Sequence, residues 1–365
     1  MPIQTALDSI NQNQGSPFGF KNRIINGNMA ISQGAAAATI TPATSSAYAT
    51  NYPVDRFEVI VGAASKLTTA QSTTAATGFN FSTLITSSSA YTVGAGEIFA
   101  IRHKIEGFNT SDLAFGTVNA QKITLSFWVR SSVTGTFGGS IQNSAANRSY
   151  PFTYTIDVID TFEYKTITIP GDTSGTWIGA TNGIGLTINF GLGVGATYSG
   201  TANAWAGADY RSATSATSVV ATNGATFYIT GVQVEKGSTA TSFDYRPFGT
   251  ELQLCQKYFT KSQSWAAAVG AADGQNLLAW YAVTTAVLAG WASHKVSMRT
   301  APAITIYRQD GTINATNRFT DGAAVTGTTT CPEPGIEGFR YVSNASSGFT
   351  VGTYYQFYYI ASAEL

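Results

Sequence analysis

The feature that most constrains this chain is a strict alternation over residues 122–130, which read KITLSFWVR. Ile123, Leu125, Phe127 and Val129 fall on one side of an extended backbone, because successive side chains of a strand point to opposite faces. A helix would need apolar residues at every third or fourth position instead. Residues 122–130 therefore predict a β-strand with one buried face.

Similar short runs recur between stretches rich in glycine, asparagine, serine and threonine. Their Val, Ile, Phe, Tyr and Thr residues favour the pleated sheet. Tracts such as 68–77 and 212–222 are interpreted as long loops and plain edge strands. Further strands are predicted at 52–60, 164–169, 185–190, 227–235, 277–283, 295–298, 303–307 and 354–360. Many strands without alternating helices predict an all-β chain of sandwich or jelly-roll domains.

Gly231 interrupts the strand predicted at 227–235. Phe227 and Ile229 precede it on one parity, and Val232 and Val234 follow on the other. One extra residue in a strand restores a common buried face after such a switch. We therefore predict a β-bulge at Gly231, a residue type often found at bulges.

The first residues have a different character. Within 1–21, Ile3, Leu7 and Ile10 share one helical face, although so short a helix needs a partner for stability. Either this segment is an arm that attaches the chain to something else, or it is a frayed terminus. No secretory signal is expected in this segment, because it lacks an apolar run.

Near residue 250 the strand pattern stops. Thr250 and Gln253 fit a capping box. In this motif the side chain of the first residue accepts the backbone N–H of the fourth, and the side chain of the fourth accepts the backbone N–H of the first. A short helix is thus predicted to link two domains. We expect an N-terminal jelly-roll β-sandwich at 22–249 and a smaller C-terminal β-sandwich domain at 250–365.

Charge is scarce and balanced. Charged residues make up 11% of the chain, against about 25% in an average soluble domain. Lys and Arg together number 20, as do Asp and Glu, which gives no electrostatic footprint for nucleic acid or anionic lipid. No stretch approaches the roughly 20 apolar residues of a membrane span. We expect no nucleic-acid partner and no membrane insertion.

No cofactor is expected. Cys255 and Cys331 could form one disulfide, or remain two buried thiols. His103 and His294 lie far from the two cysteines in sequence, so these four residues do not match the spacing of a zinc site. Loop carboxylates could hold a structural Ca²⁺, but no ligand loop is spelled out.

Catalysis is poorly supported by the sequence. No Gly-x-Ser-x-Gly, His-Glu-x-x-His or phosphate-loop motif is present. Carboxylates are available for a glycosidase pair, although their spacing is not diagnostic and such residues mostly form turns. They are Asp55, Glu58, Glu106, Asp157, Asp160, Glu163 and Glu235. We therefore expect no enzyme and no catalytic residue.

Four groups of segments, taken together in this order, resemble phage structural proteins usually described as tail-fibre or appendage proteins. That family has a jelly roll like those of carbohydrate-binding modules. The resemblance spans residues 22–365, and its segments are specific as a set. They are NRIINGNM (22–29) with YPVDRF (52–57); LSFWVR (125–130); GVQVEKG (231–237) leading into FDYRPFGTEL (243–252); and MRTAP (298–302) with ASAEL (361–365).

The resemblance implies a virion protein, made in the host cytoplasm, that forms a homotrimer. Its partners would be copies of itself, other virion proteins contacted through residues 1–21, and a glycan of the host surface. The matched segments themselves are interpreted as fold-forming, with Phe127 in the core and Gly237 and Gly249 in turns.

Sugar recognition needs aromatic faces together with amides, hydroxyls or carboxylates. Trp177 and Trp205 lie in glycine-rich loops, and Asp209 and Tyr210 follow shortly after Trp205. These four are the candidate ligand-binding residues, and the alternative is that both indoles fold back to cap the sandwich. Trp128, on the polar parity of its strand, either packs against a second sheet or faces solvent, and we expect it to pack in a core.

Three functions remain open. The chain could be a receptor-binding tail fibre or similar appendage whose weak sites act through several copies. It could instead decorate the capsid or serve as an adaptor without a receptor role. The third, a polysaccharide depolymerase, has least support, because no repeat of fixed period is present.

Overall fold

The structure is a computed structural model that describes residues 20–44, 48–270 and 276–365. Strands dominate it, as expected. The described residues fall into two compact units. The first unit holds those up to Ala30, Thr39–Pro247 and Leu365, and the second holds Ile31–Ala38 and Phe248–Glu364. The division after Pro247 comes two residues before the predicted one, and residues 31–38 had no counterpart in the prediction.

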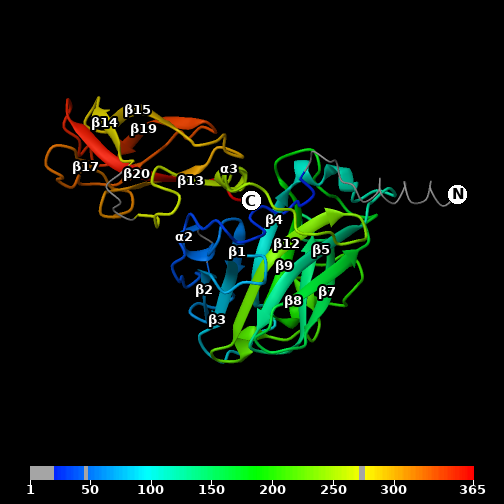
Figure 1. Cartoon of the computed structure of the whole chain (residues 1–365). Helices are drawn as coiled ribbons and strands as arrows, with labels where there is room; N and C mark the ends of the chain where they lie inside the picture. Colours follow the sequence, from blue (N-terminus) through cyan, green and yellow to red (C-terminus); the bar gives the residue numbers. More distant parts are fainter. Residues whose placement is uncertain (1–19, 45–47, 271–275) are drawn as a thin grey trace. The chain divides into compact units, whose positions relative to one another are not determined.

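The first unit contains two five-stranded sheets (Figure 1). All neighbouring strands within them are antiparallel. One sheet runs β2 (Leu67–Ser72), β3 (Ser82–Ser87), β12 (Thr226–Lys236), β5 (Ile123–Ser131) and β8 (Glu163–Ile169). The other runs β1 (Phe57–Ile60), β4 (Ile98–Glu106), β9 (Ile184–Val194), β6 (Gly135–Gln142) and β7 (Ser149–Ile156).

The order of these strands is that of a jelly roll. Strands β3, β12, β5 and β8 are neighbours in one sheet, and β4, β9, β6 and β7 are neighbours in the other. The chain therefore passes repeatedly from sheet to sheet, as two Greek keys do. Phe127 on β5 meets Phe190 on β9 with ring centroids 5.0 Å apart, so the core lies between the two sheets.

Both sequence predictions for the central strands are confirmed. Ile123, Leu125, Phe127 and Val129 on β5 are fully buried. On β12 the register shifts between Thr230 and Gln233, and Gly231 has a φ of +61°. The bulge keeps the apolar side chains on the buried face, since Phe227 and Ile229 before it and Val232 and Val234 after it are all 0% exposed.

The segments that carry the family resemblance contact one another in the first unit. Asn22 donates its side-chain amide to Val232 O at 3.1 Å, and Asn26 donates to Asp55 O at 2.9 Å. Arg246 donates to Ile24 O at 3.0 Å. The contacts of Asn22 and Arg246 join parts of the chain that lie more than 200 residues apart, and that of Asn26 spans 29 residues, which supports their interpretation as fold-forming.

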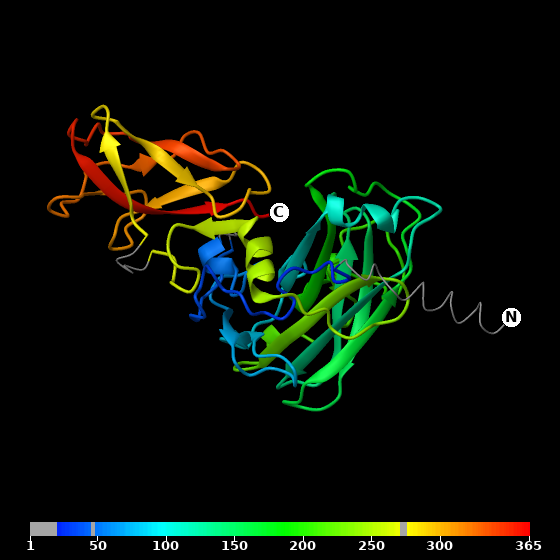
Figure 2. The ribbon, with the colours of Figure 1, turned by 45° about the horizontal axis from the view of Figure 1, so that its top comes forward.

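The second unit is the smaller β-sandwich and is organised around one long strand, β20 (Tyr354–Ser362), the red strand in Figure 2. Its beginning pairs with β14 (Leu278–Ala282) and β17 (Asn317–Arg318), and its end with β13 (Phe259–Lys261) and β16 (Ala303–Tyr307). Further strands extend this sheet: β15 (Val287–Ser293), β19 (Gly338–Asn344) and β18 (Thr329–Thr330).

Short elements complete the described chain. Helix α2 covers Tyr48–Asn51, and β10 (Ser199–Gly200) pairs in parallel with β11 (Ser212–Ala213). Single 3₁₀ turns lie at Gly107–Asn109, Ser111–Leu113, Ala196–Tyr198 and Val219–Ala221.

The linking helix exists, but its predicted start is wrong. Helix α3 spans Phe248–Gln256, so Thr250 lies inside it and cannot be its N-cap. Pro247 precedes the first helical residue, and proline is well tolerated at a helix start because it lacks the N–H that would go unbonded there. Gly249, expected in a turn, is therefore helical.

Two predicted strands also need correction. Residues 295–298 form no strand, and of 52–60 only Phe57–Ile60 are extended in a sheet. Local apolar character misled the prediction in both places, because Met298, Tyr52 and Val54 are buried from loops and turns rather than from a sheet.

Candidate functional site

Trp128 lies on the outer face of β5, not in the core where it was expected. The alternation that buries Phe127 turns its neighbour outward, and Trp128 is half-buried there. It is paired across the sheet with Tyr164 on β8 and with Thr230 on β12. The two rings, Trp128 and Tyr164, are 5.2 Å apart and tilted by 43°, and they form one aromatic wall on the sheet.

A second aromatic wall comes from two loops. Phe79 lies between β2 and β3, and Phe243 and Tyr245 follow β12. Ring centroids lie 5.0 Å apart for Phe79 and Phe243, and 4.8 Å apart for Phe243 and Tyr245. The Tyr245 hydroxyl donates to Gly78 O at 2.6 Å, which joins the two loops.

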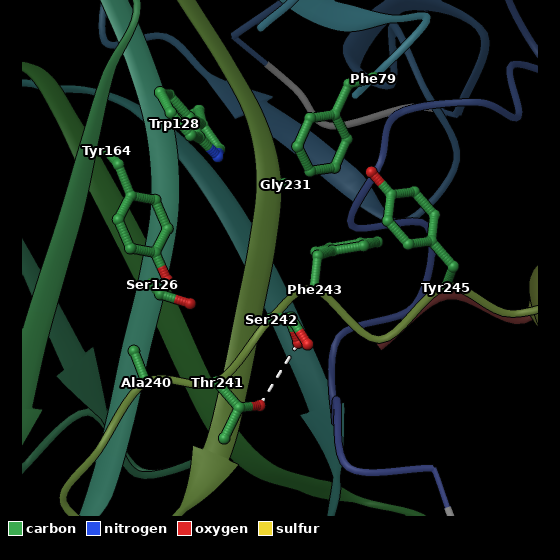
Figure 3. A pocket seen from close by; sticks show the side chains of 10 residues that line it. All are labelled: Phe79, Ser126, Trp128, Tyr164, Gly231, Ala240, Thr241, Ser242, Phe243 and Tyr245. Atoms are coloured by element: carbon green, nitrogen blue, oxygen red, sulfur yellow. Dashed lines mark hydrogen bonds between the residues drawn. The ribbon is translucent and has the colours of Figure 1, made fainter. Parts of the chain in front are cut away.

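Between the walls lies a hollow of about 460 Å³, which we call the aromatic cavity. Figure 3 shows the residues that line it, with Gly231 between Trp128 and Phe79. A Cβ atom on Gly231 would lie 2.6 Å from Phe79 Cζ and 3.0 Å from Trp128 Cδ1. The bulge glycine thus keeps the space between the two walls open.

The polar groups of the aromatic cavity are uncharged. Its ten lining residues include no Asp, Glu, Lys, Arg or His. Within the described part of the chain, no protein group hydrogen-bonds to Trp128 Nε1, the Tyr164 hydroxyl or Ser242 Oγ. Burial raises the pKa of Tyr245, so its hydroxyl stays protonated at neutral pH. The cavity therefore offers aromatic surface together with neutral hydrogen-bonding groups.

The structure brings Trp177 and Trp205 together in a different cluster. Their ring centroids are 5.6 Å apart, and Phe115 lies 4.9 Å from Trp177. Both indoles are packed against the core of the first unit. Trp205 Nε1 donates to Pro170 O at 2.8 Å and Trp177 Nε1 to Ser174 O at 3.2 Å. This packing favours the capping interpretation.

A hollow of about 410 Å³ lies beside Trp177. Its three hydroxyls donate to backbone carbonyls: Thr110 to Gly107 O, Ser111 to Phe108 O and Thr117 to Ala114 O. Their donor hydrogens are therefore already used, unlike those of Trp128 Nε1, the Tyr164 hydroxyl and Ser242 Oγ in the aromatic cavity.

Asp209 and Tyr210 are engaged elsewhere in the first unit. Asp209 accepts hydrogen bonds from Gln142 Nε2 at 2.6 Å and from Arg211 Nε at 2.9 Å. The Tyr210 ring lies against Gly200, where an added Cβ would come within 2.2 Å of Tyr210 Cδ2. Neither residue lines the aromatic cavity or the hollow beside Trp177, so the structure does not gather the four predicted residues into one site.

The seven carboxylates considered for catalysis line neither cavity of the first unit. Asp55 and Glu106 are buried. Four others are in ion pairs: Glu58 with Arg102 at 2.6 Å, Asp160 with Arg130 at 3.2 Å, and Glu163 and Asp157 with Lys165 at 2.6 Å and 3.8 Å. These pairings stabilise the fold. None of the seven carboxylates lines the aromatic cavity, so no pair of acids converges there.

Metal ligands do not gather among the described residues, where no three His, Cys, Asp or Glu side chains could hold an ion.

Cys255 and Cys331 are not joined by a disulfide, and burial raises the pKa of Cys331 to about 11. No helix in the part of the chain that the structure describes is long and apolar enough to cross a membrane.

Sequence reasoning missed the aromatic cavity, although two signals pointed to it. Trp128 stands on the polar parity of the clearest strand, opposite the face that Phe127 shares. Phe243 and Tyr245 alternate in a segment with no strand pattern. What the sequence could not supply was that Phe79, 49 residues before Trp128, completes the second wall.

No protein-family profile matches the chain, and no curated protein matches it. Solved structures match part of this chain. A domain of bacteriophage CBA120 tailspike protein 4, described as enzymatically active, matches at 14% identity and a TM-score of 0.29, over 62% of this chain and 23% of that chain.

Carbohydrate-binding modules also match. The family 11 module of Clostridium thermocellum, solved with a β-1,3-1,4-mixed-linked tetrasaccharide, matches at 10% identity and a TM-score of 0.27, over 56% of this chain and 98% of that chain. The xylan-binding CBM22-1 domain of Paenibacillus barcinonensis Xyn10C matches at 7% identity and a TM-score of 0.24, over 50% and 87%.

Proposed function

We propose that this chain binds glycans without catalysis and that the aromatic cavity is its binding site. The observation that carries the proposal is the combination of two aromatic walls with neutral groups, namely Trp128 Nε1, the Tyr164 hydroxyl and Ser242 Oγ, to which no described part of the chain hydrogen-bonds. Aromatic faces contact the CH side of a pyranose, and hydroxyl and indole groups hydrogen-bond its hydroxyls. A volume of about 460 Å³ lies within the ordinary range of small-molecule sites.

The chemistry of the lining also defines the class of sugar. Burying a charged sugar without a partner of opposite charge is costly. Since no lining residue carries a charge, the units held in the cavity are uncharged hexoses, pentoses or N-acetylated sugars rather than uronic or sialic acids.

Replacing the central aromatic side chain tests the proposal. Trp128→Ala removes the sheet-borne indole, and we expect affinity for the best glycan found on an array to fall at least about tenfold, the equivalent of about 1.4 kcal/mol. Titration calorimetry measures it. Trp291→Ala is the matched control, because Trp291 is an exposed indole of the second unit, 60% accessible. Equal affinities of the two folded variants would refute the site.

We further propose that the protein serves as a phage virion appendage, a tail fibre or similar, that recognises the host surface as a homotrimer. The family resemblance of residues 22–365 supports this role, and several copies would multiply a weak site by avidity. Immunogold microscopy of particles locates the protein. A head position without glycan binding would favour the alternative, a capsid-decoration protein.

Trimer formation has its own physical support in exposed apolar side chains. In the second unit Tyr354 and Phe319 are 53% and 57% exposed, and exposed aromatic side chains favour burial against another copy. Sedimentation in native buffer tests this. A stable monomer at micromolar concentration would contradict the trimer.

The absence of catalysis is likewise a proposal. Incubating the protein with host surface polysaccharide should release no reducing ends, and release would favour a depolymerase instead.

A further inference from the structure

The second wall of the aromatic cavity lacks regular secondary structure. Residues 240–246, which we call the wall segment, follow β12 and contain Phe243 and Tyr245. Tyr245 is 56% exposed, so burial alone does not fix it. The wall rings therefore depend on specific contacts for their positions.

Asp244 lies between the two wall aromatics and makes the most direct of these contacts. Its Oδ2 accepts the backbone N–H of Lys21 at 2.8 Å and that of Asn22 at 3.1 Å. Its own backbone N–H donates to Gln233 Oε1 on β12 at 2.8 Å. One side chain thus joins the wall segment to a part of the chain more than 220 residues away.

Other contacts repeat the same connection. Lys21 Nζ donates to Thr241 Oγ1 at 2.8 Å. The Arg246 guanidinium lies 4.9 Å from the centre of the Phe20 ring and donates to Ile24 O at 3.0 Å. The wall segment is therefore attached to residues 20–24 at three points: before Phe243, between Phe243 and Tyr245, and after Tyr245.

We propose that Asp244 is a positioning residue of the aromatic cavity: by holding the wall segment to residues 20–24, it sets the placement of Phe243 and Tyr245 and hence the affinity for glycan. The effect of Asp244 on glycan affinity rests on the proposed function. Its effect on the placement of the two rings does not require a glycan. A carboxylate accepting two backbone N–H groups forms charge-assisted bonds, which are stronger than neutral ones.

The chain offers a matched control for this test. Asp112 accepts two hydrogen bonds from Arg23, both at 2.8 Å, and so also holds the 20–24 segment. Asp112 lines no part of the aromatic cavity. Asp112→Ala therefore removes a comparable carboxylate contact to the same segment without touching the wall.

The experiment compares Asp244→Ala, Asp244→Asn and Asp112→Ala in the full chain. Protein labelled with 5-fluorotryptophan reports the cavity by fluorine NMR, with the Trp128 signal assigned through Trp128→Phe. We expect Asp244→Ala to shift or broaden that signal and to weaken binding of the array-selected glycan about tenfold. Asp244→Asn, which keeps an acceptor oxygen, should restore much of both, and Asp112→Ala should change neither.

Several outcomes would overturn the inference. An unchanged Trp128 signal and affinity in Asp244→Ala would do so, as would equal changes in Asp112→Ala. Thermal unfolding of each variant guards against a general effect, because a structural role alone lowers the melting temperature without moving the Trp128 signal in the folded state. A shifted signal in a protein that binds no glycan would instead sink the proposed function and leave the positioning role standing.

Discussion

At Gly231 one backbone conformation serves both the sheet and the aromatic cavity. Its φ of +61° lies in the left-handed region, which costs other residues about 1–2 kcal/mol. The same residue separates Phe79 from Trp128, whose nearest atoms lie 2.6 Å and 3.0 Å from the position of an added Cβ.

Gly231→Ala should therefore lower the free energy of unfolding by about 2 kcal/mol and abolish glycan binding, since strain and overpacking act together. Urea denaturation and calorimetric titration measure the two effects. Gly207→Ala is the control, because nothing lies within 4 Å of an added Cβ there, and we expect a change within about 0.5 kcal/mol. If both variants were equally stable, this account of the bulge would be wrong.

His103 makes stability depend on pH. It is 1% exposed, and burial, with the nearby charge of Arg56, holds its pKa well below the ordinary value of 6.5. Below about pH 6.5 the unfolded chain binds a proton at this residue while the folded chain does not, so acid favours unfolding.

We expect stability to fall as pH drops from about 7.5 to about 5.5, by up to about 1.4 kcal/mol per pH unit below 6.5. The pKa of His294 is also lowered by burial, so it adds to the slope in the same direction. His103→Asn should reduce the slope of the urea midpoint against pH, even though it lowers stability at the higher pH. A slope identical to that of the unmodified chain would show that His103 is not its source.

At the scale of the element, the outer face of β5 continues past the aromatic cavity. Arg130 lies two residues beyond Trp128, about 6.6 Å along the strand. It is paired with Tyr228 on β12, and its guanidinium lies 5.0 Å from the centre of that ring. Phe162 adds a third group, with its ring 6.1 Å from Tyr228. This second aromatic row can contact a further sugar of a chain that leaves the cavity.

Tyr228→Ala should thus weaken binding of a long oligosaccharide several-fold while leaving a short one, which fills only the cavity, nearly unaffected. Tyr228→Phe keeps the ring and should behave like the unmodified chain. Titrations with a length series of the array-selected glycan measure the difference. Equal losses of affinity for short and long ligands would mean that Tyr228 acts on binding in the aromatic cavity itself and contacts no further sugar.

Elements with internal periodicity could be predicted from the sequence, whereas contacts between distant segments could not. Strand β5 and the bulge at Gly231 follow from alternation alone, because one buried face dictates which residues point inward. The start of α3 was misplaced because Thr250 and Gln253 fit a capping pattern that Pro247 pre-empts. The aromatic cavity was missed because its second wall is placed by Asp244 and residues 20–24, a contact with no local signal.

At the scale of the whole molecule, the chain does not divide into units at a single point. Residues 31–38 belong to the second unit, although they lie more than 200 positions before the rest of it. Ile31 and Gln33 are both 0% exposed. Gln33 Nε2 donates to Phe259 O at 3.0 Å, and Gln33 O accepts from the buried ammonium of Lys261 at 2.6 Å.

A fragment of residues 248–365 should therefore fail to fold, because it leaves the Lys261 ammonium without the Gln33 carbonyl and the Phe259 carbonyl without the Gln33 amide. Losing a hydrogen-bond partner of a buried charged group costs about 1.5–3 kcal/mol, a large share of a small domain's stability. Joining residues 31–38 to residue 248 through a Gly/Ser linker should restore a folded unit. Near-ultraviolet circular dichroism distinguishes the two proteins, since the aromatic core of this unit gives a signal only when packed. A cooperative, well-packed 248–365 fragment would mean that residues 31–38 merely cover a unit that is already complete.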